Sequence, residues 1–267
     1  MNVECKAQVL MEKITSRHNS LYMHMKKLGT SKSYRDEKGE FLFDGLKLLE
    51  EAVNSDAEVT TVLTASPIPF PLSIDTRVYN ADRGLLDSLS QLKNSHDTLA
   101  ICKMPDRTVL SDTSGTHILL DGVQDPGNVG TIIRTADALG INSVILTRGC
   151  ADMYNPKTIR ATMGAVFRQK VCHMSMHSLT VLRESGVRFI GAVIGEKSID
   201  VIKADLSNAV IAVGNEGQGL SDDLISLCQE MVMIPVASEC ESLNVSVAAA
   251  IMMWEAKRVR SSTICHR

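Results

Sequence analysis

The stretch from Asp125 to Arg134 carries the residue types best suited to binding chemistry in this chain. It reads Asp-Pro-Gly-Asn-Val-Gly-Thr-Ile-Ile-Arg and lies between a strand-like run at 117–121 and a helix-like run at 129–139. A loop of this kind between a strand and a helix is where α/β proteins place ligand sites. Asn128 at the mouth of the helix and Arg134 about two turns further on could both face a polyanion. A plain turn followed by a solvated helix is the alternative, and this stretch alone does not decide between them.

Two further loops have the same setting, with a strand before and a helix after. One is Gly214-Asn215-Glu216-Gly217-Gln218-Gly219, and the other runs from Ile234-Pro235-Val236 to Ser242-Leu243-Asn244-Val245-Ser246. Because the carboxyl ends of parallel strands meet at one edge of a sheet, we expect all three loops to form one pocket. The glycines let backbone approach a ligand, although their spacing matches neither the dinucleotide-binding fingerprint nor the P-loop. Helix packing and N-capping are the alternative explanations for these loops.

Candidate phosphate contacts lie in two basic segments. Lys157 and Arg160 are three residues apart and share a helix face. The segment from Lys13 to Lys38 is also rich in lysine and arginine, and Lys32 and Arg35 are its candidate contacts. A solvated helix face is the alternative explanation for both segments.

Hydrophobic periodicity predicts alternating strands and helices in the second half of the chain. Strands are expected at 117–121, 142–147, 188–194, 209–213 and 231–235, and helices at 129–139, 156–166, 177–185, 220–228 and 242–260. This alternation is typical of an α/β fold with a mostly parallel sheet covered on both faces.

The first hundred residues predict a smaller α/β module. Its expected helices are 7–28, 45–53 and 84–92, and its expected strands are 41–43, 59–63 and 99–104. The polar, turn-rich stretch 105–115 is the predicted linker. The predicted domains are therefore 1–104 and 116–267.

Composition excludes several function classes. The 267 residues are 44% hydrophobic and 22% charged with a net charge of -3, which argues against a globally basic nucleic-acid binder but allows a local basic patch. The seven cysteines form no C-x-x-C pair, so we expect free thiols and no metal site. Neither a signal peptide nor a membrane-length apolar run is present, so we expect a cytoplasmic protein. No Ser-His-Asp or Cys-His nucleophile arrangement is indicated.

In this order the loops resemble the SpoU/TrmH family of S-adenosylmethionine-dependent RNA 2′-O-ribose methyltransferases. The likeness rests on Asp125–Gly130 with Arg134, on Gly214–Ser221, on Ile234-Pro235 with Glu241–Ala248, and on Asn155-Pro156-Lys157 with Arg160–Gly164. The N-terminal module is similar, more loosely, to the substrate-binding domain of the ribosomal RNA branch, through Tyr34-Arg35 and the run that starts at Gly45.

The resemblance implies a deep trefoil knot, a homodimer, and S-adenosylmethionine bound in the knot without a metal. It implies that Arg134 is the catalytic residue at the ribose hydroxyl, with the active site organised by Asn128, Glu216, Ser242 and Asn244. It implies cofactor contacts at Gly214, Ile234 and Leu243, with Asn215, Gly219 and Val236 beside them. It also implies an RNA contact at Arg160, to which we add Lys157, Lys32 and Arg35.

Several functions fit this likeness. Methylation of ribosomal RNA leads, because the N-terminal module resembles an RNA-binding appendage. Transfer RNA methylation, self-protection against a ribosome-directed antibiotic, and RNA binding without methyl transfer are the alternatives. A nucleotide-cofactor oxidoreductase is disfavoured by the glycine spacing.

Overall fold

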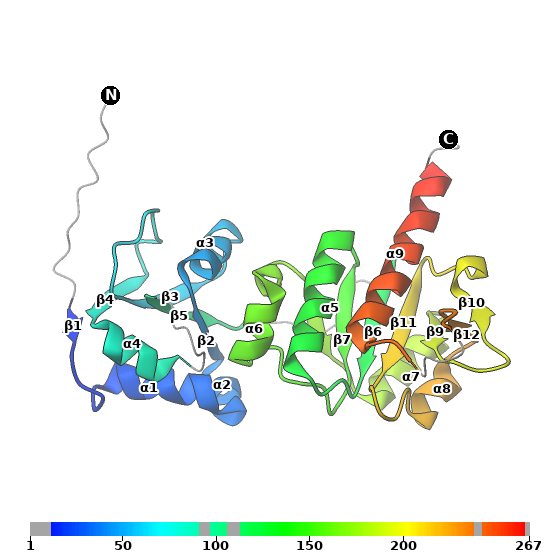
Figure 1. Ribbon diagram of the computed structural model, residues 1–267, viewed down its shortest axis with the longest axis horizontal. Helices are drawn as coiled ribbons and strands as arrows, with labels where there is room; N and C mark the ends of the chain where they lie inside the picture. The colour runs from blue at the N-terminus through cyan, green and yellow to red at the C-terminus, as the bar shows by residue number, and fades with distance from the viewer. Residues whose placement is uncertain (1–11, 91–96, 106–112, 238–241, 265–267) are drawn as a thin grey trace. The chain divides into compact units, whose positions relative to one another are not determined.

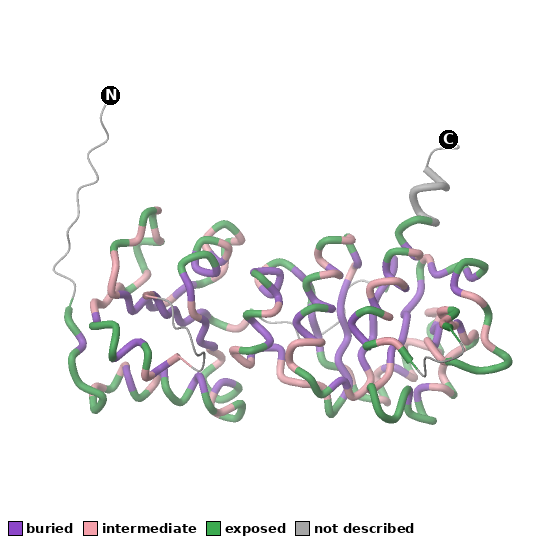
Figure 2. The backbone as a smooth tube through the Cα atoms, viewed as in Figure 1, coloured by how far each residue is buried: buried purple, intermediate pink, exposed green. Residues whose placement is uncertain are grey.

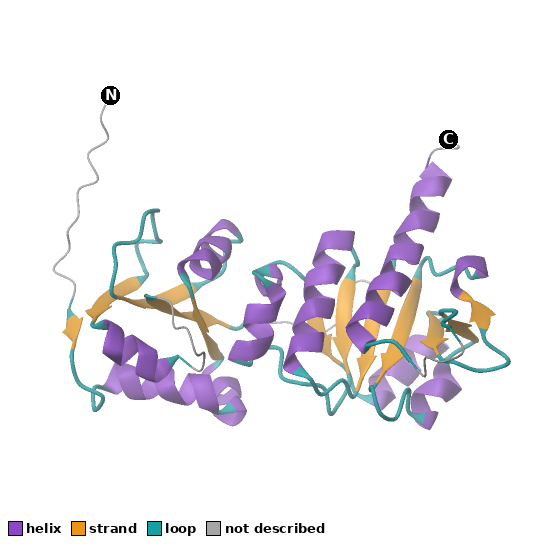
Figure 3. Ribbon diagram, viewed as in Figure 1, coloured by secondary structure: helices purple, strands orange, loops and turns teal. Residues whose placement is uncertain are grey.

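The computed structural model describes residues 12–90, 97–105, 113–237 and 242–264. The chain divides into two compact units, Met1–Pro105 with Tyr154–Pro156, and Asp106–Met153 with Lys157–Arg267. Helices and strands are mixed in both units (Figure 3). Most of the predicted linker, and Cys5, Cys240 and Cys265, lie outside the described residues. The described cysteines, Cys102, Cys150, Cys172 and Cys228, form no disulfide.

The first unit is built on a five-stranded mixed sheet. Its strands lie in the order β1 (Lys13–Ile14), β4 (Arg77–Ala81), β3 (Val59–Thr64), β5 (Thr98–Lys103) and β2 (Glu40–Asp44). The pairs of β4 with β1 and with β3 are parallel, whereas β5 is antiparallel to both of its neighbours. The described residues of the unit also form four helices: α1 (Ser20–Thr30), α2 (Lys32–Lys38), α3 (Leu46–Asn54) and α4 (Arg83–Leu89). Apolar residues of α1 and α4 pack on the sheet in one buried cluster that includes Met25, Leu28 and Leu86.

The second unit is built on a seven-stranded sheet in which every pair is parallel. The strands lie in the order β10 (Ile199–Asp200), β12 (Glu230–Met233), β9 (Arg188–Ala192), β11 (Ala209–Gly214), β6 (His117–Asp121), β7 (Ser143–Leu146) and β8 (Val171–His173). The central strands are buried along their length (Figure 2), as expected for a parallel sheet covered on both faces. The predicted α/β class and mostly parallel sheet are confirmed, whereas the knot stays a prediction.

Helices cover both faces of this sheet (Figure 1). On one face α5 (Pro126–Leu139) packs against α9 (Val245–Ile264). On the other, α7 (Met176–Glu184) and α8 (Asp222–Leu227) contribute Leu179 and Leu224 to a cluster with Leu119 and Val210 of the sheet. Two 3-10 turns, η1 (Ala165–Phe167) and η2 (Val201–Lys203), and the short helix α6 (Pro156–Thr162) complete the unit.

Some predicted elements differ from the structure for local reasons. Of the helix expected over 7–28, residues 7–11 lie outside the described residues. The described part, α1, begins at Ser20, where the Asn19 side chain caps it by accepting a hydrogen bond from Leu21 N. The helix expected over 156–166 ends at Thr162, because Met163 and Gly164 have φ of 50° and 96°, which a right-handed helix cannot contain. Strands β1, β4, β8 and β10 were not predicted from the sequence, and β1, β8 and β10 are short edge strands.

Candidate functional site

A cavity of about 360 Å³ lies at the carboxyl ends of β9, β11 and β12. This is the edge of the sheet at which the sequence predicts a pocket. All six positions predicted to contact a cofactor line it, namely Gly214, Asn215, Gly219, Ile234, Val236 and Leu243. Glu216 and Ser242, predicted to organise the active site, also line it. The structure therefore brings two loops and the start of α9 together around one space.

Gly214 explains why backbone closes one side of this cavity. An ideal Cβ at Gly214 would lie 2.1 Å from the carbonyl carbon and 2.2 Å from the carbonyl oxygen of Gly219. The loop folds back on itself here, since Asn215 N donates to Gly219 O at 3.0 Å and Gly219 N donates to Asn215 O at 2.8 Å. Glycine is needed at position 214 because of this close approach of backbone to backbone.

A chain of side-chain hydrogen bonds joins the three predicted loops. Asn128 Nδ2 donates to Glu216 Oε1 at 2.5 Å, and Asn244 Nδ2 donates to Asn128 Oδ1 at 3.2 Å. Asn244 Oδ1 in turn accepts from Ser246 N at 2.9 Å and from Ser246 Oγ at 2.6 Å. Both ends of the Asn128 amide are thus occupied, which fixes its orientation between Glu216 and Asn244.

Local capping places Asn128 at this point. The Asp125 side chain accepts a hydrogen bond from Asn128 N at 2.9 Å, and Pro126 occupies the first position of α5. Both features define the start of a helix. Asn128 therefore lies in the first turn of α5, beside the strand ends that carry Glu216.

Asn128 and Asn244, like Arg134, are not among the residues that line the cavity, but Arg134 differs from both in its contacts. It lies on α5, is exposed, and does not line the cavity. Within the described part of the chain its guanidinium makes no hydrogen bond or ion pair. The side chain is thus available to a ligand outside the cavity, such as an RNA phosphate or a ribose oxygen.

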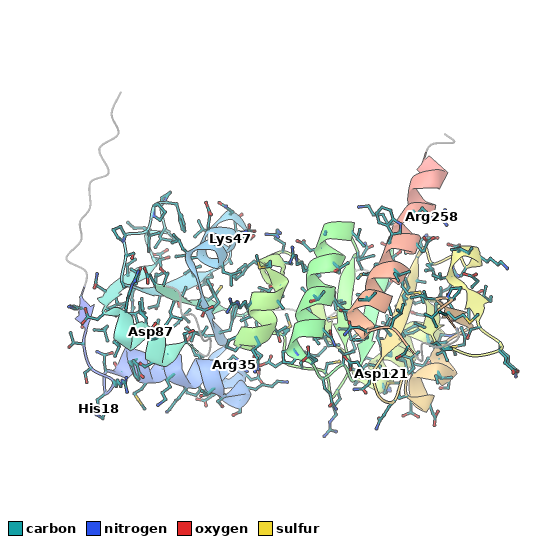
Figure 4. The ribbon with its side chains drawn as sticks, in the orientation of Figure 1. His18, Arg35, Lys47, Asp87, Asp121 and Arg258 are labelled. Atoms are coloured by element: carbon teal, nitrogen blue, oxygen red, sulfur yellow. The ribbon has the colours of Figure 1, made fainter. Side chains whose placement is uncertain are left out.

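The candidate phosphate contacts divide into exposed and buried residues. Lys157 and Arg160 are exposed on α6, and Lys32 is exposed at the start of α2. Arg35 is only 3% exposed and donates from Nη1 to the Leu28 carbonyl at 2.6 Å (Figure 4). The Arg35 guanidinium is thus bonded inside the fold, and RNA contact at Arg35 stays a prediction.

Sequence reasoning missed part of the cavity wall. Val193 and Ile194, which follow β9, line it, and so do Ala248 and Met252 of α9. The end of the predicted strand 188–194 was a signal for Val193 and Ile194, since the strand ends at the same sheet edge.

Among the described residues no group of three or more His, Cys, Asp or Glu could hold a metal ion. None of the described helices is long and apolar enough to cross a lipid bilayer.

Comparisons with known proteins agree on one family. The model of the SpoU rRNA Methylase family matches residues 115–254. The chain is 32% identical over 247 residues to the 23S rRNA (guanosine(2553)-2′-O)-methyltransferase RlmP of Bacillus subtilis, covering 91% of this chain and 98% of that protein. It is 30% identical over 270 residues to the 23S rRNA (uridine(2479)-2′-O)-methyltransferase of Streptomyces viridochromogenes, covering 94% and 93%.

A solved structure with bound cofactor is similar over nearly the whole chain. It is the AdoMet-bound rRNA methyltransferase from Sinorhizobium meliloti, with a TM-score of 0.82 and 27% identity. The match covers 93% of this chain and 98% of that one. The likeness therefore extends over both units and not only over the sheet that carries the cavity.

Proposed function

The chain belongs to the SpoU rRNA Methylase family, and we propose on this basis that it transfers a methyl group from S-adenosylmethionine to a ribose 2′-hydroxyl of ribosomal RNA. It is an RNA methyltransferase, and S-adenosylmethionine is its cofactor. The observation that carries the proposal is the convergence of the Gly214 loop, the Ile234 loop and the start of α9 on one cavity. The hydrogen bonds from Glu216 through Asn128 to Asn244 lie at its border.

The residues of the cavity fit S-adenosylmethionine. The volume of the cavity lies within the range of small-molecule sites, roughly 300–1,000 Å³, and its wall combines apolar side chains with polar groups. We propose that Gly214, Ile234 and Leu243 hold the cofactor, with Asn215, Gly219 and Val236 beside them. The glycine at position 214 supports this, because without a Cβ the backbone of the loop can approach a ligand closely.

When bound, S-adenosylmethionine supplies a methyl group that its sulfonium has already activated for transfer. The protein then needs to position the ribose and to handle one proton. Arg134 stabilises the negative charge that develops on the 2′-oxygen, since a fixed donor aimed at developing charge lowers the barrier. An arginine stays protonated in proteins and is a poor base, so the proton leaves to a neighbouring phosphate of the RNA.

Asn128, Glu216, Ser242 and Asn244 organise the site in this proposal. The Asn128 amide is held at both ends by Glu216 and Asn244, so it fixes the Glu216 loop relative to the start of α9. Such preorganisation matters because a misplacement of about 1 Å can cost about 100-fold in rate.

We propose that the substrate is large-subunit ribosomal RNA. Two curated relatives that match over most of this chain are named as 23S rRNA 2′-O-methyltransferases, one for a guanosine and one for a uridine. We assign RNA contact to Lys157 and Arg160, and to Lys32 of the first unit, because all three are exposed cations. The protein would act where ribosomal RNA is made and used, in the cytoplasm.

We also propose that the protein is a homodimer that associates through α5 and α9. A groove of about 360 Å³ between these helices is lined by Thr131, Thr135, Ser246, Val247, Ala250, Ile251 and Trp254. Trp254 is 56% exposed and Val247 is 47% exposed. Exposed tryptophan beside small apolar residues is typical of a contact between protein chains.

The test is transfer of a labelled methyl group from S-adenosylmethionine to RNA. Purified protein should label large-subunit ribosomal RNA, and nuclease digestion should release a 2′-O-methylated nucleoside. Mapping of ribose methylation in a deletion strain and its parent should show one position that is lost. A protein that binds the cofactor but labels neither ribosomal nor transfer RNA would contradict the proposal and leave RNA binding without catalysis.

A further inference from the structure

Asp121 holds two segments that are far apart in the sequence. It is the last residue of β6 (Figure 4), and its Oδ2 accepts hydrogen bonds from Ser221 N at 2.8 Å and Ser221 Oγ at 2.7 Å. Its Oδ1 accepts from Thr147 Oγ1 at 3.0 Å. Thr147 Oγ1 also accepts from Gly122 N at 3.1 Å. Neutral donors therefore surround a carboxylate, and hydrogen bonds to a charged acceptor are among the strong ones.

These bonds hold the far end of the Gly214 loop. The loop starts at Gly214, which lies opposite Asp121 in the register of β11 with β6, and it ends at Ser221, which Asp121 binds. A second contact holds the start of the loop, because Asn215 Nδ2 donates to the Gly122 carbonyl at 2.8 Å. Both ends of the loop are thus tied to the adjacent residues Asp121 and Gly122.

The same two residues begin the loop that leads to Asn128. Asp121 and Gly122 precede the N-cap of α5 by only a few positions, and Asn128 binds Glu216 in the middle of the Gly214 loop. Three connections therefore join the two loops: Asp121 with Ser221, Gly122 with Asn215, and Asn128 with Glu216. Neither Asp121 nor Ser221 lines the cavity, so the pair acts on it only through the backbone of the loop.

We infer that Asp121 and Ser221 are positioning residues for cofactor binding. The inference rests on the proposed function, because it assigns the cavity to S-adenosylmethionine. The pair fixes the backbone of Gly219 and Leu220, which line the cavity and immediately precede Ser221. Loss of the pair frees this end of the loop, so the cofactor must order it on binding, and affinity falls.

The experiment compares hydroxyl removal with hydroxyl retention at position 221. Ser221→Ala removes the Oγ donor, whereas Ser221→Thr keeps it, and Asp121→Asn removes the charge of the acceptor. Ser226→Ala is the matched control, because Ser226 lies on α8, which begins directly after Ser221, and its hydroxyl donates to the Asp223 carbonyl at 2.6 Å. Cofactor affinity is measured by calorimetry without RNA, and thermal unfolding, kcat and the KM for RNA are measured alongside.

We expect Ser221→Ala and Asp121→Asn to weaken cofactor binding about tenfold, as befits a hydrogen bond to a charged group. Ser221→Thr should restore it, Ser226→Ala should leave it unchanged, and the KM for RNA should stay constant. Wild-type affinity in Ser221→Ala and Asp121→Asn overturns the inference. It is also overturned if Ser221→Thr fails to restore binding, or if affinity follows unfolding temperature across all variants, the control included.

The outcome is distinguishable from a failure of the proposed function. Because affinity is measured without RNA, a wild-type protein that binds the cofactor and methylates nothing refutes the proposed function while the comparison at position 221 still stands. A wild-type protein that does not bind S-adenosylmethionine at all overturns both.

Discussion

Replacement of Gly214 by alanine would place a methyl group against the backbone of Gly219 and Leu220. The new Cβ would lie 2.1 Å from the Gly219 carbonyl carbon and 2.3 Å from Leu220 N. Ordinary contact begins near 3.4 Å, so the facing backbone must move by about 1.3 Å. The two hydrogen bonds between Asn215 and Gly219 close the loop at this point, and a shift of that size breaks or distorts both.

The free-energy cost of Gly214→Ala follows from the steric overlap and from the loss of the two hydrogen bonds between Asn215 and Gly219. Overpacking of a tight site costs about 1–3 kcal/mol, and two backbone hydrogen bonds contribute about 0.5–1.5 kcal/mol each. We therefore expect a free-energy penalty of about 2–6 kcal/mol. If the loop rearranges while the fold survives, this penalty falls on cofactor binding, where about 3 kcal/mol corresponds to about 100-fold in Kd.

Calorimetric titration with S-adenosylmethionine and thermal unfolding together measure where the penalty falls. Gly217→Ala is the control, because a Cβ there would meet only Asn215 Oδ1 at 3.5 Å, an ordinary contact in the same loop. We expect Gly217→Ala to bind within a few-fold of wild type. A folded Gly214→Ala protein with wild-type affinity and wild-type unfolding temperature would refute the assignment of this loop to the cofactor.

The remaining predictions concern the substrate side, the first unit and assembly. Arg134→Lys should lower the single-turnover methylation rate by about 100-fold with unchanged cofactor affinity, because lysine lacks the planar fork of donors; a near-full rate would show that the fork is not needed. Arg35→Met should lower the free energy of unfolding by about 1.5–3 kcal/mol, because it leaves the Leu28 carbonyl without the hydrogen bond from the Arg35 guanidinium. Lys32→Met should instead weaken RNA binding without lowering the unfolding temperature. Trp254→Glu should convert a dimer to a monomer in sedimentation equilibrium, and an unchanged mass would place any interface elsewhere.

The cavity could be predicted from the sequence because its signals are local. Each loop follows a β-forming run and precedes a helix, and parallel strands bring their carboxyl ends to one edge. The pocket was predicted in this way, whereas the cofactor contacts at Gly214, Ile234 and Leu243 came from the family likeness, and all three residues line the cavity. The pattern of Gly, Pro and Asn at the start of α5 similarly placed Asn128, which Asp125 caps.

What could not be predicted depends on contacts between distant residues. Asp121 and Ser221 are joined by the register of β6 with β11, which no local pattern encodes. Arg35 resembled a phosphate contact because its neighbours are basic, but its exposure depends on how α1 and α2 meet, and there its guanidinium binds the Leu28 carbonyl. The end of α6 depends on the backbone conformation of Met163, a residue type that by itself predicts continued helix.

Helix geometry explains why Arg134 and Asn128 do not meet at the cavity. Six residues correspond to about 600° of rotation at about 100° each, so the two side chains point in directions about 120° apart. Asn128 binds Glu216, whereas Arg134 shares a face of α5 with Gly130 and Asp137, one turn away in each direction.

That face of α5 is directed toward the segment that contains α6. A Cβ at Gly130 would lie 2.5 Å from the Ala161 Cβ, and Asp137 pairs with Arg168 at 3.0 Å. Arg134 lies between these two contacts along α5, and the exposed Arg160 directly precedes Ala161 in α6. Two cations on neighbouring helices attract a phosphate, and a bound phosphate beside Arg134 is the group that the proposed reaction needs to receive the proton. Arg160 would in this way serve catalysis by holding the RNA phosphate where Arg134 meets the ribose oxygen, so its loss should lower kcat as well as RNA affinity.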